Sequence, residues 1–242
     1  MSSSVKVTEG TLEFKWPSIE KKCETWYKVY GDLKQSRSGR PLVIVHGGPG
    51  ACHNYLLSLK LLAENYGIPV VFYDQLGNGN STHIREKRLD ESFWTTDLFI
   101  AELDNLLEGL GIADDYDLLG QSWGGMLGSM FAIRGHKGLK RLIISNSPAS
   151  MTLWADSCDE WRKQLPREID EALEKHEKNG TYDDPEYQQV CMHHHDGAKL
   201  THIPSRPSCS STRDTFAALI PSRRRFCKLW SGWKRTTRST GR

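Results

Sequence analysis

A serine flanked by glycines is the first feature of this sequence that indicates chemistry. Residues 120–125 read GQSWGG, and an apolar run, YDLLGQ at residues 116–121, leads into them. A G-x-S-x-G sequence between a strand and a helix holds its serine on a sharp turn, with the hydroxyl exposed at the carboxyl end of the strand. We therefore interpret Ser122 as a candidate nucleophile. The alternative is a tight strand-to-helix turn with an incidental serine.

A second glycine-rich segment follows another apolar run. HGGPG, residues 46–50, continues from PLVIVH, residues 41–46. Adjacent glycines after a buried strand let backbone N–H groups point into the space above a sheet, which is what an oxyanion hole requires. We expect the two donors to be the N–H groups of Gly48 and of Trp123, the residue after the serine. The alternative for this segment is an ordinary Gly-Pro turn.

Alternating strand and helix patterns position these segments. Short apolar runs predict buried strands at residues 41–46, 69–74 and 116–121, and a fourth strand at 139–146. Periodic patterns predict helices at 53–67, 92–110 and 124–134. An antiparallel pair, residues 11–16 and 22–30, precedes them. This alternation implies crossover connections, an α/β fold and a mostly parallel sheet. Residues 74–82, DQLGNGNST, suit a loop at the same sheet edge, which either lines a pocket or simply connects elements.

The pattern changes twice toward the carboxyl end. From residue 148 to about 190 the sequence is helical in character, acidic and rich in tryptophan, as in an insertion over the sheet. Residues 191–242 contain 11 Lys or Arg and 2 acids, a net charge of +9, whereas the preceding 190 residues carry a net charge of −7. No buried strand is recognisable in this last segment. We therefore expect a core at 1–147, a helical insertion at 148–190 and a basic tail at 191–242.

Taken in order, HGGPG, YDQLGNGNS and GQSWGG resemble the α/β-hydrolase fold, and more narrowly the proline iminopeptidases and their relatives. Those relatives are serine exopeptidases that remove an N-terminal residue, often proline. The similarity covers residues 10–190. It implies Ser122 as the nucleophile, Gly48 and Trp123 as oxyanion donors, and a helical cap from about residue 148. It also implies that cap carboxylates hold the free amine of the substrate, without indicating which ones.

The other two members of a catalytic triad are not recognisable. In this family the acid and then the histidine follow the serine, in loops near late strands or the C-terminus. The late histidines and acids lack such strands; they are His193, His194, His195, His202, Asp196 and Asp214. At His195 the order is also histidine before acid. We expect none of these residues to complete a triad, and we interpret the late strands as missing.

The abrupt change near residue 191 favours a shifted reading frame or a mis-spliced transcript over a genuine disordered tail. Consecutive histidines at 193–195 cannot all face one ion at tetrahedral geometry, so we expect no metal site there. The segment at residues 223–235 interleaves aromatic and basic side chains, as nucleic-acid-binding segments do, but a solvated or mistranslated tail is favoured. We therefore expect no nucleic-acid partner.

Composition predicts a globular, cytoplasmic protein. The chain has 242 residues, of which 38% are hydrophobic and 26% charged. No apolar run approaches the roughly 20 residues of a membrane span, and the N-terminus lacks the apolar core of a signal peptide. Six cysteines without a C-x-x-C pair favour reduced thiols. We expect no cofactor and no membrane partner.

Three functions remain open at this stage. The first is an aminopeptidase that acts on small peptide or amide substrates through Ser122. The second is an amidase or esterase for small molecules on the same scaffold. The third is a catalytically dead or truncated product without a general base, whose sheet would have an open apolar edge and poor solubility.

Overall fold

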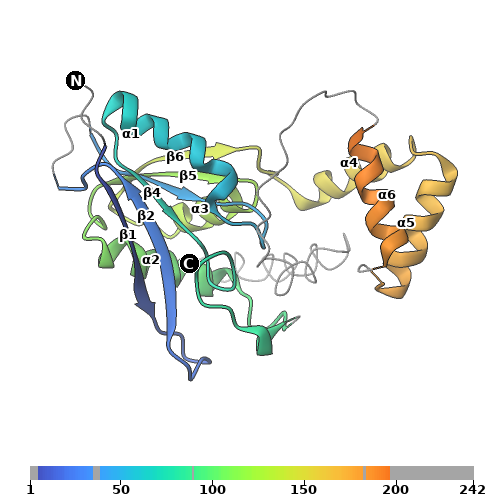
Figure 1. Cartoon of the computed structure of the whole chain (residues 1–242), viewed down its shortest axis with the longest axis horizontal. Helices are drawn as coiled ribbons and strands as arrows, with labels where there is room; N and C mark the ends of the chain where they lie inside the picture. Colours follow the sequence, from blue (N-terminus) through green and yellow to red (C-terminus); the bar gives the residue numbers. More distant parts are fainter. Residues whose placement is uncertain (1–4, 35–38, 89, 182–183, 197–242) are drawn as a thin grey trace, which may run out of the picture. The chain divides into compact units, whose positions relative to one another are not determined.

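The computed structural model describes residues 5–34, 39–88, 90–181 and 184–196, with side chains up to residue 190. The chain divides into two compact units, one that reaches Ala149 and one that begins at Ser150. The described part of the first unit is a sheet with helices, and that of the second is a set of helices (Figure 1). No described helix combines the length and apolar character that crossing a bilayer requires. The expected tail beyond residue 196 lies outside the described residues.

The first unit is built on a six-stranded sheet with the order β1-β2-β4-β3-β5-β6. β1 pairs with β2, and β2 with β4, in antiparallel fashion. β4, β3, β5 and β6 are parallel to one another, which confirms the mostly parallel sheet. The strands are β1 Val7–Phe14, β2 Cys23–Tyr30, β3 Leu42–Val45, β4 Val70–Tyr73, β5 Tyr116–Gln121 and β6 Leu139–Ser145.

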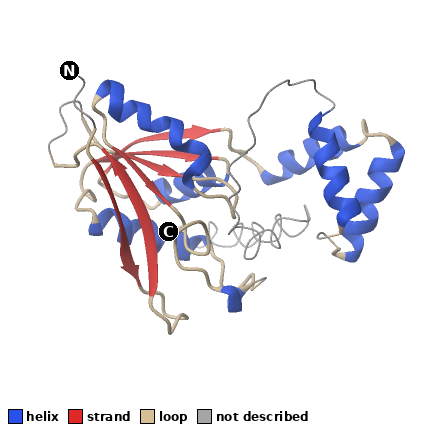
Figure 2. Cartoon of the chain, viewed as in Figure 1, coloured by secondary structure: helices blue, strands red, loops and turns tan. Residues whose placement is uncertain are grey.

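Helices cover both faces of this sheet (Figure 2). On one face lie the 3-10 helix η1, His53–Lys60, and α1, Leu61–Tyr66; on the other lie α2, Thr96–Gly109, and α3, Trp123–Ile133. A short 3-10 helix, η2, covers Arg85–Lys87. An apolar cluster joins η1 and α1 to β3 and β4; it contains Leu42, Ile44, Leu56, Ala63, Val70 and Phe72. Every residue of β3 and β4 is buried, which explains their continuous apolar sequences.

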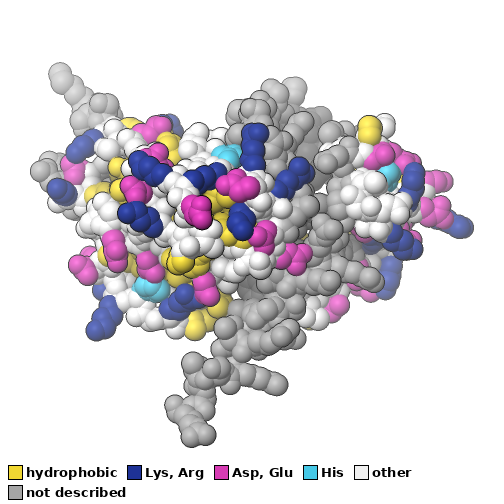
Figure 3. All heavy atoms as spheres, turned by 90° about the horizontal axis from the view of Figure 1, so that it is seen from below, with side chains coloured by type: hydrophobic (Ala, Val, Ile, Leu, Met, Phe, Trp, Pro, Cys, Tyr) yellow, Lys and Arg dark blue, Asp and Glu magenta, His cyan; other side chains and the backbone are white. Residues whose placement is uncertain are grey.

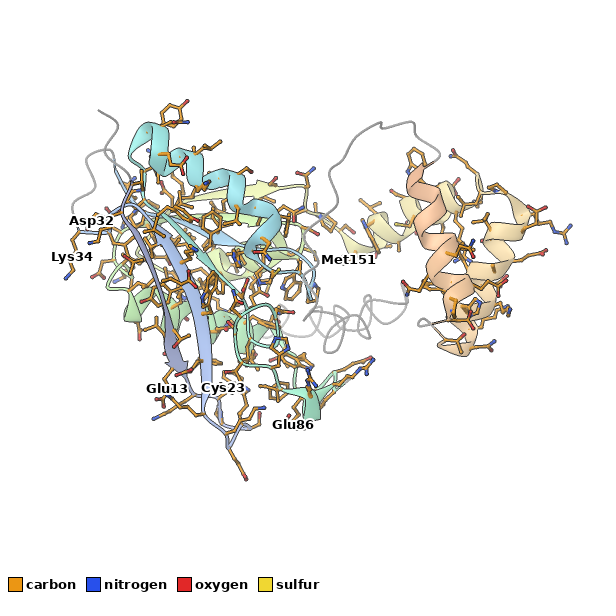
Figure 4. The ribbon with its side chains drawn as sticks, in the orientation of Figure 1. Glu13, Cys23, Asp32, Lys34, Glu86 and Met151 are labelled. Carbon is orange, nitrogen blue, oxygen red and sulfur yellow. The ribbon has the colours of Figure 1, made fainter. Side chains whose placement is uncertain are left out.

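The carboxyl ends of the parallel strands meet at one edge of the sheet. β2 runs antiparallel to β4, with Tyr27 opposite Tyr73 and Tyr30 opposite Val70. Cys23, at the start of β2, therefore lies toward the carboxyl end of β4. Asp32, which follows β2, lies at the opposite edge (Figure 4). Ser122 and the HGGPG segment follow β5 and β3 directly, so both begin at the edge where the parallel strands end.

Two elements differ from their sequence predictions. β1 begins at Val7 rather than at residue 11, because it pairs with β2 along its whole length. The single helix expected at 53–67 is instead η1 followed by α1, and it ends at Gly67, whose φ is 68°. The first residue of η1, His53, uses its backbone N–H and its ring to bind the Asp74 carboxylate, both at 2.8 Å. This contact with Asp74 fixes the start of η1, whose 3-10 turns are tighter than those of an α-helix.

The second unit contains α4, Met151–Arg162, α5, Arg167–Asn179, and α6, Pro185–Asp196, which continues past residue 190. Arg162 links α4 to α5 through Asp170 and through Glu177, which its Nη1 meets at 2.7 Å. A carboxylate of α6, Glu186, accepts hydrogen bonds from Lys175 Nζ at 2.6 Å and His176 Nε2 at 2.9 Å. These contacts connect the three helices through charged groups.

Candidate active site

Ser122 occupies a strained turn between β5 and α3. Its φ is 53° and its ψ is −119°, a conformation that L-residues rarely adopt and that costs about 1–3 kcal/mol. The backbone N–H of Ser122 donates to the carbonyl of Ser145 at 2.9 Å, so the end of β6 holds the turn. The carbonyl of Ser122 accepts from the N–H groups of Gly125 and Met126, at 3.0 and 3.2 Å. The predicted strand–turn–helix context of this serine is therefore observed.

The flanking glycines are required by close backbone packing. A Cβ at Gly120 would overlap the carbonyl of Gly124, in the first turn of α3. A Cβ at Gly124 would overlap the carbonyl of Val45 and would lie 2.7 Å from that of His46. The first turn of α3 therefore packs directly on the end of β3. This contact brings the serine turn against the start of the HGGPG segment.

The two expected oxyanion donors are backbone amides on these adjoining segments. Gly48 has a φ of 119°, and a Cβ there would overlap the N–H of Gly50. Within the described residues, the structure gives the Gly48 N–H no hydrogen-bond acceptor. Trp123 is the first residue of α3, and the first amides of a helix have no intrahelical acceptor. The positive end of the α3 dipole adds to the field at this point.

His46, the first residue of HGGPG, is structural. Its side chain is fully buried; Nδ1–H donates to the carbonyl of Gly47 at 2.9 Å, and Nε2 accepts from the N–H of Gln75 at 3.0 Å. These partners fix the neutral tautomer with the proton on Nδ1. Burial lowers the pKa of His46, which also favours the neutral form. His46 therefore connects the segment after β3 to the loop after β4.

Gln75 extends this connection to α3. Its side-chain Oε1 accepts from the indole Nε1 of Trp123 at 3.0 Å, and its Nε2 donates to the carbonyl of His46 at 3.4 Å. Gln75 lies in the DQLGNGNST loop, for which the sequence left the role open. The structure places this residue between the two segments that carry the expected donors. The loop therefore contributes to the site and does not only connect elements.

The adjacent Asp74 fixes the base of the same loop. It is fully buried and accepts from the N–H of His53 and of Asn80, at 2.8 and 2.9 Å, and from the His53 ring. Burial raises the pKa of Asp74, but the His53 hydrogen bond, the neighbouring histidines and the Asn80 amide outweigh it, so the net pKa is lowered. Asp74 is therefore a stable carboxylate at neutral pH. It orients the first residue of η1.

Tyr55 and Gln121 are further site residues that the sequence patterns did not indicate. The Tyr55 hydroxyl accepts from the N–H of Gly47 at 2.7 Å and donates to Gln121 Oε1 at 2.5 Å. Tyr55 belonged to a predicted helix, and no motif distinguished it from other aromatic residues. The only signal was its position a few residues after HGGPG.

Among the residues whose side chains are described, no histidine is hydrogen-bonded to Ser122. Those with described side chains are engaged elsewhere: His46 with Gly47 and Gln75, His53 with Asp74, His83 with Gly79, His136 with Asp104 and His176 with Glu186. The side chains of the late histidines and acids named above lie outside the described residues. The structure thus places the serine turn against the start of the HGGPG segment, which carries one of the expected donors. Among the described side chains it assigns no general base.

Comparison with known proteins places the chain in a family. A family model described as the alpha/beta hydrolase fold matches residues 40–186. The proline iminopeptidase of Lactobacillus delbrueckii subsp. lactis is 36% identical over 205 residues, which cover 84% of this chain and 65% of that protein. The proline iminopeptidase of Clostridium botulinum is 37% identical over 187 residues, which cover 77% and 59%. The chain thus spans less than two thirds of the length of these relatives.

Solved structures agree with the sequence relatives. VinJ superposes with a TM-score of 0.72 at 45% identity, covering 88% of this chain and 67% of that one. The proline iminopeptidase of Mycobacterium smegmatis superposes with a TM-score of 0.67 at 36% identity, covering 88% and 69%. The strand order, the strained serine between β5 and α3, and these matches together show that the chain belongs to the α/β-hydrolase fold family, in its proline iminopeptidase-like group.

Proposed function

We propose that this chain carries the nucleophile and the oxyanion hole of a serine hydrolase, with Ser122 as the nucleophile. The observation that supports this proposal most directly is the left-handed backbone of Ser122, with φ 53°, between β5 and α3. A serine needs no such conformation for folding, and strained residues concentrate at functional sites. Family membership supports the same role.

The proposed reaction is acyl transfer. Ser122 Oγ attacks the carbonyl carbon of the scissile bond while a general base takes the hydroxyl proton. The N–H groups of Gly48 and Trp123 donate to the oxygen on which negative charge develops. The leaving amine departs with a proton, and water then hydrolyses the acyl-enzyme and regenerates the serine. His46 and Gln75 hold both donors in place, because they connect the two segments.

The proposed substrates are small peptides or amides with a free N-terminus, from which the N-terminal residue, often proline, is released. The support is that the relatives in Lactobacillus delbrueckii and Clostridium botulinum are proline iminopeptidases. Turnover of proline anilide compared with a simple carboxylic ester tests this substrate class. We expect the anilide to be preferred; a preference for the ester indicates a small-molecule esterase on the same fold.

The nucleophile is tested by labelling the purified protein with a fluorophosphonate, which reacts with activated serines. We expect labelling of the wild-type chain and its complete loss in Ser122→Ala. Circular dichroism and a thermal melt establish that both proteins are folded. Equal labelling of the two proteins contradicts the role of Ser122.

All five histidines whose side chains are described are engaged with other groups, which favours a second candidate, a binding protein that retains the fold without the chemistry. Removing the general base eliminates most of the triad's contribution, which is of the order of 10⁶-fold in serine hydrolases. A folded wild-type protein that does not label supports this candidate. Its binding is then measured by calorimetry with a prolyl peptide.

A further inference from the structure

Tyr55 connects the two segments that carry the expected oxyanion donors. We propose that its hydroxyl is a positioning group: it holds the HGGPG segment and the Ser122 turn in register and leaves Gly48 as the donating amide. This inference rests on the proposed function, because it assigns a role to Tyr55 in that site. The role is positioning, since the hydroxyl acts through Gly47 and Gln121 and not on the reacting atoms.

The Tyr55 hydroxyl makes one hydrogen bond as acceptor and one as donor. It accepts from the N–H of Gly47 at 2.7 Å and donates its single proton to Gln121 Oε1 at 2.5 Å. Gly47 directly precedes Gly48, and Gln121 directly precedes Ser122. The hydrogen-bonded bridge Gly47–Tyr55–Gln121 therefore ends one residue before Gly48 on one segment and one residue before Ser122 on the other. No other residue type of similar length offers one donor and one acceptor at the end of a rigid ring.

The bridge also decides which amide of the loop is available. The Gly47 N–H is occupied by Tyr55, so it does not point at a substrate. The next amide, that of Gly48, has no hydrogen-bond acceptor within the described part of the chain. An oxyanion donor must be free in the resting site and fixed in direction. Tyr55 supplies the fixed direction by anchoring the residue before Gly48.

The absence of a side chain at Gly47 is explained by the same bridge. A Cβ at this position would lie 2.6 Å from Gln121 Oε1 and 2.8 Å from the Tyr55 hydroxyl. The space beside Gly47 is thus filled by the bridge itself. Half of the Tyr55 surface is exposed, and the partial burial of the rest raises its pKa, so the hydroxyl keeps its proton through the neutral range and can donate to Gln121.

A second bridge predicts that loss of Tyr55 has a partial effect. Gln75 independently connects His46 to Trp123 across the same two segments. Without the Tyr55 hydroxyl, the segments therefore stay together while Gly47 and Gly48 gain freedom. Removing an oxyanion donor outright costs about 10²–10³ in rate, and misplacing one costs less. We expect a loss of about 10-fold.

The test compares Tyr55→Phe with Tyr30→Phe. Tyr30 is paired with Val70, at the opposite ends of the parallel strands from Ser122. Its described contacts are made by the ring, with Phe72, Lys28 and Lys60, and these remain in a phenylalanine. Hydrogen exchange of the Gly47 amide is measured by NMR, together with kcat and KM on proline anilide and the rate of fluorophosphonate labelling. In Tyr55→Phe we expect Gly47 exchange to accelerate at least ~10-fold, and kcat and labelling to fall ~10-fold, with KM within ~2-fold. Tyr30→Phe should match the wild type in all readouts.

Gln121 provides the conservative comparison. Gln121→Glu keeps an acceptor for the Tyr55 hydroxyl and should retain slow Gly47 exchange, whereas Gln121→Leu should behave like Tyr55→Phe. Unchanged Gly47 exchange in Tyr55→Phe overturns the proposal, and so does faster exchange with unchanged kcat in an active protein. If the wild type neither labels nor turns over substrate, the proposed function fails. Gly47 exchange then decides by itself whether Tyr55 holds the loop.

Discussion

At the scale of single residues, Glu102 is an acidic group in the core. It lies on α2, is fully buried, and accepts hydrogen bonds from Thr25 Oγ1 at 2.6 Å and from the N–H of Leu76 at 2.8 Å. Burial raises the pKa of Glu102 to about 7; the two hydrogen bonds oppose this shift and the charge of Asp74 adds to it. Glu102 thus links α2 and β2 to the loop that carries Gln75.

Stability should therefore depend on pH through Glu102. The native state retains this proton up to about pH 7, whereas the unfolded chain releases it near 4.5. The stabilisation of the native state by this proton is fully present below pH 4.5 and is lost as pH rises through 7. At 1.4 kcal/mol per pKa unit, the free energy of unfolding falls by about 3 kcal/mol over this range. In Glu102→Gln, the free energy of unfolding measured in urea should not fall in this way between pH 5 and pH 8. Glu108→Gln, on the exposed side of α2, should retain it; equal pH dependence in the two variants contradicts the assignment.

Two glycines of α3 form a matched pair for the packing of the serine turn. A Cβ at Gly124 would overlap the carbonyl of Val45, and backbone cannot move aside there. A Cβ at Gly128 would meet only the ends of Leu142 and Leu118, at 3.1 and 3.2 Å. Gly124→Ala should lower the free energy of unfolding by about 3 kcal/mol or more, and Gly128→Ala should change it by less than about 1 kcal/mol. Chemical denaturation measures both; similar values for the two would argue against close packing at Gly124.

At the scale of elements, α4 and α5 are joined by one arginine. The Arg162 side chain is only 17% exposed and binds Asp170 and Glu177. Arg162→Met leaves two acids without their cation and should destabilise the second unit by about 1–3 kcal/mol. Arg167→Met is the control, because the Arg167 side chain is 89% exposed and its pair with Glu171 contributes about 0.5 kcal/mol or less. Limited proteolysis within residues 150–180 should accelerate only for Arg162→Met.

At the scale of the whole molecule, β6 is the last strand in the order of the described sheet. Among the described residues it pairs with β5 alone, and Ile143 and Ile144 are 46% and 54% exposed. On the face drawn in Figure 3, acidic and basic side chains are interspersed. An open apolar strand edge favours association between copies. Ile144→Lys should therefore reduce the particle size in light scattering, whereas Ile133→Lys on α3 should not; a monomeric wild type that melts cooperatively would contradict this prediction.

The sequence by itself determined the local parts of this protein. Apolar runs located β3 and β4, because strands buried on both faces have no polar positions. They also located β5, in which buried residues alternate with half-buried ones. G-x-S-x-G located the serine turn, because only glycine tolerates the backbone contacts at Gly120 and Gly124. The mostly parallel sheet followed from the alternation of these runs with helices. Each of these features depends on residues that are neighbours in the chain.

Only the tertiary structure decided how the site is held together. Tyr55 meets Gln121 across 66 positions of sequence, Gln75 meets Trp123 across 48, and Thr25 meets Glu102 across 77. Nothing in the local pattern of a tyrosine, a glutamine or a glutamate specifies a partner at such a distance. Their roles depend on which strands become neighbours, and the packing of the whole sheet sets that order. The register of β3, β4 and β5 thus brings the three segments that follow these strands to the same end of the sheet, where the candidate site lies.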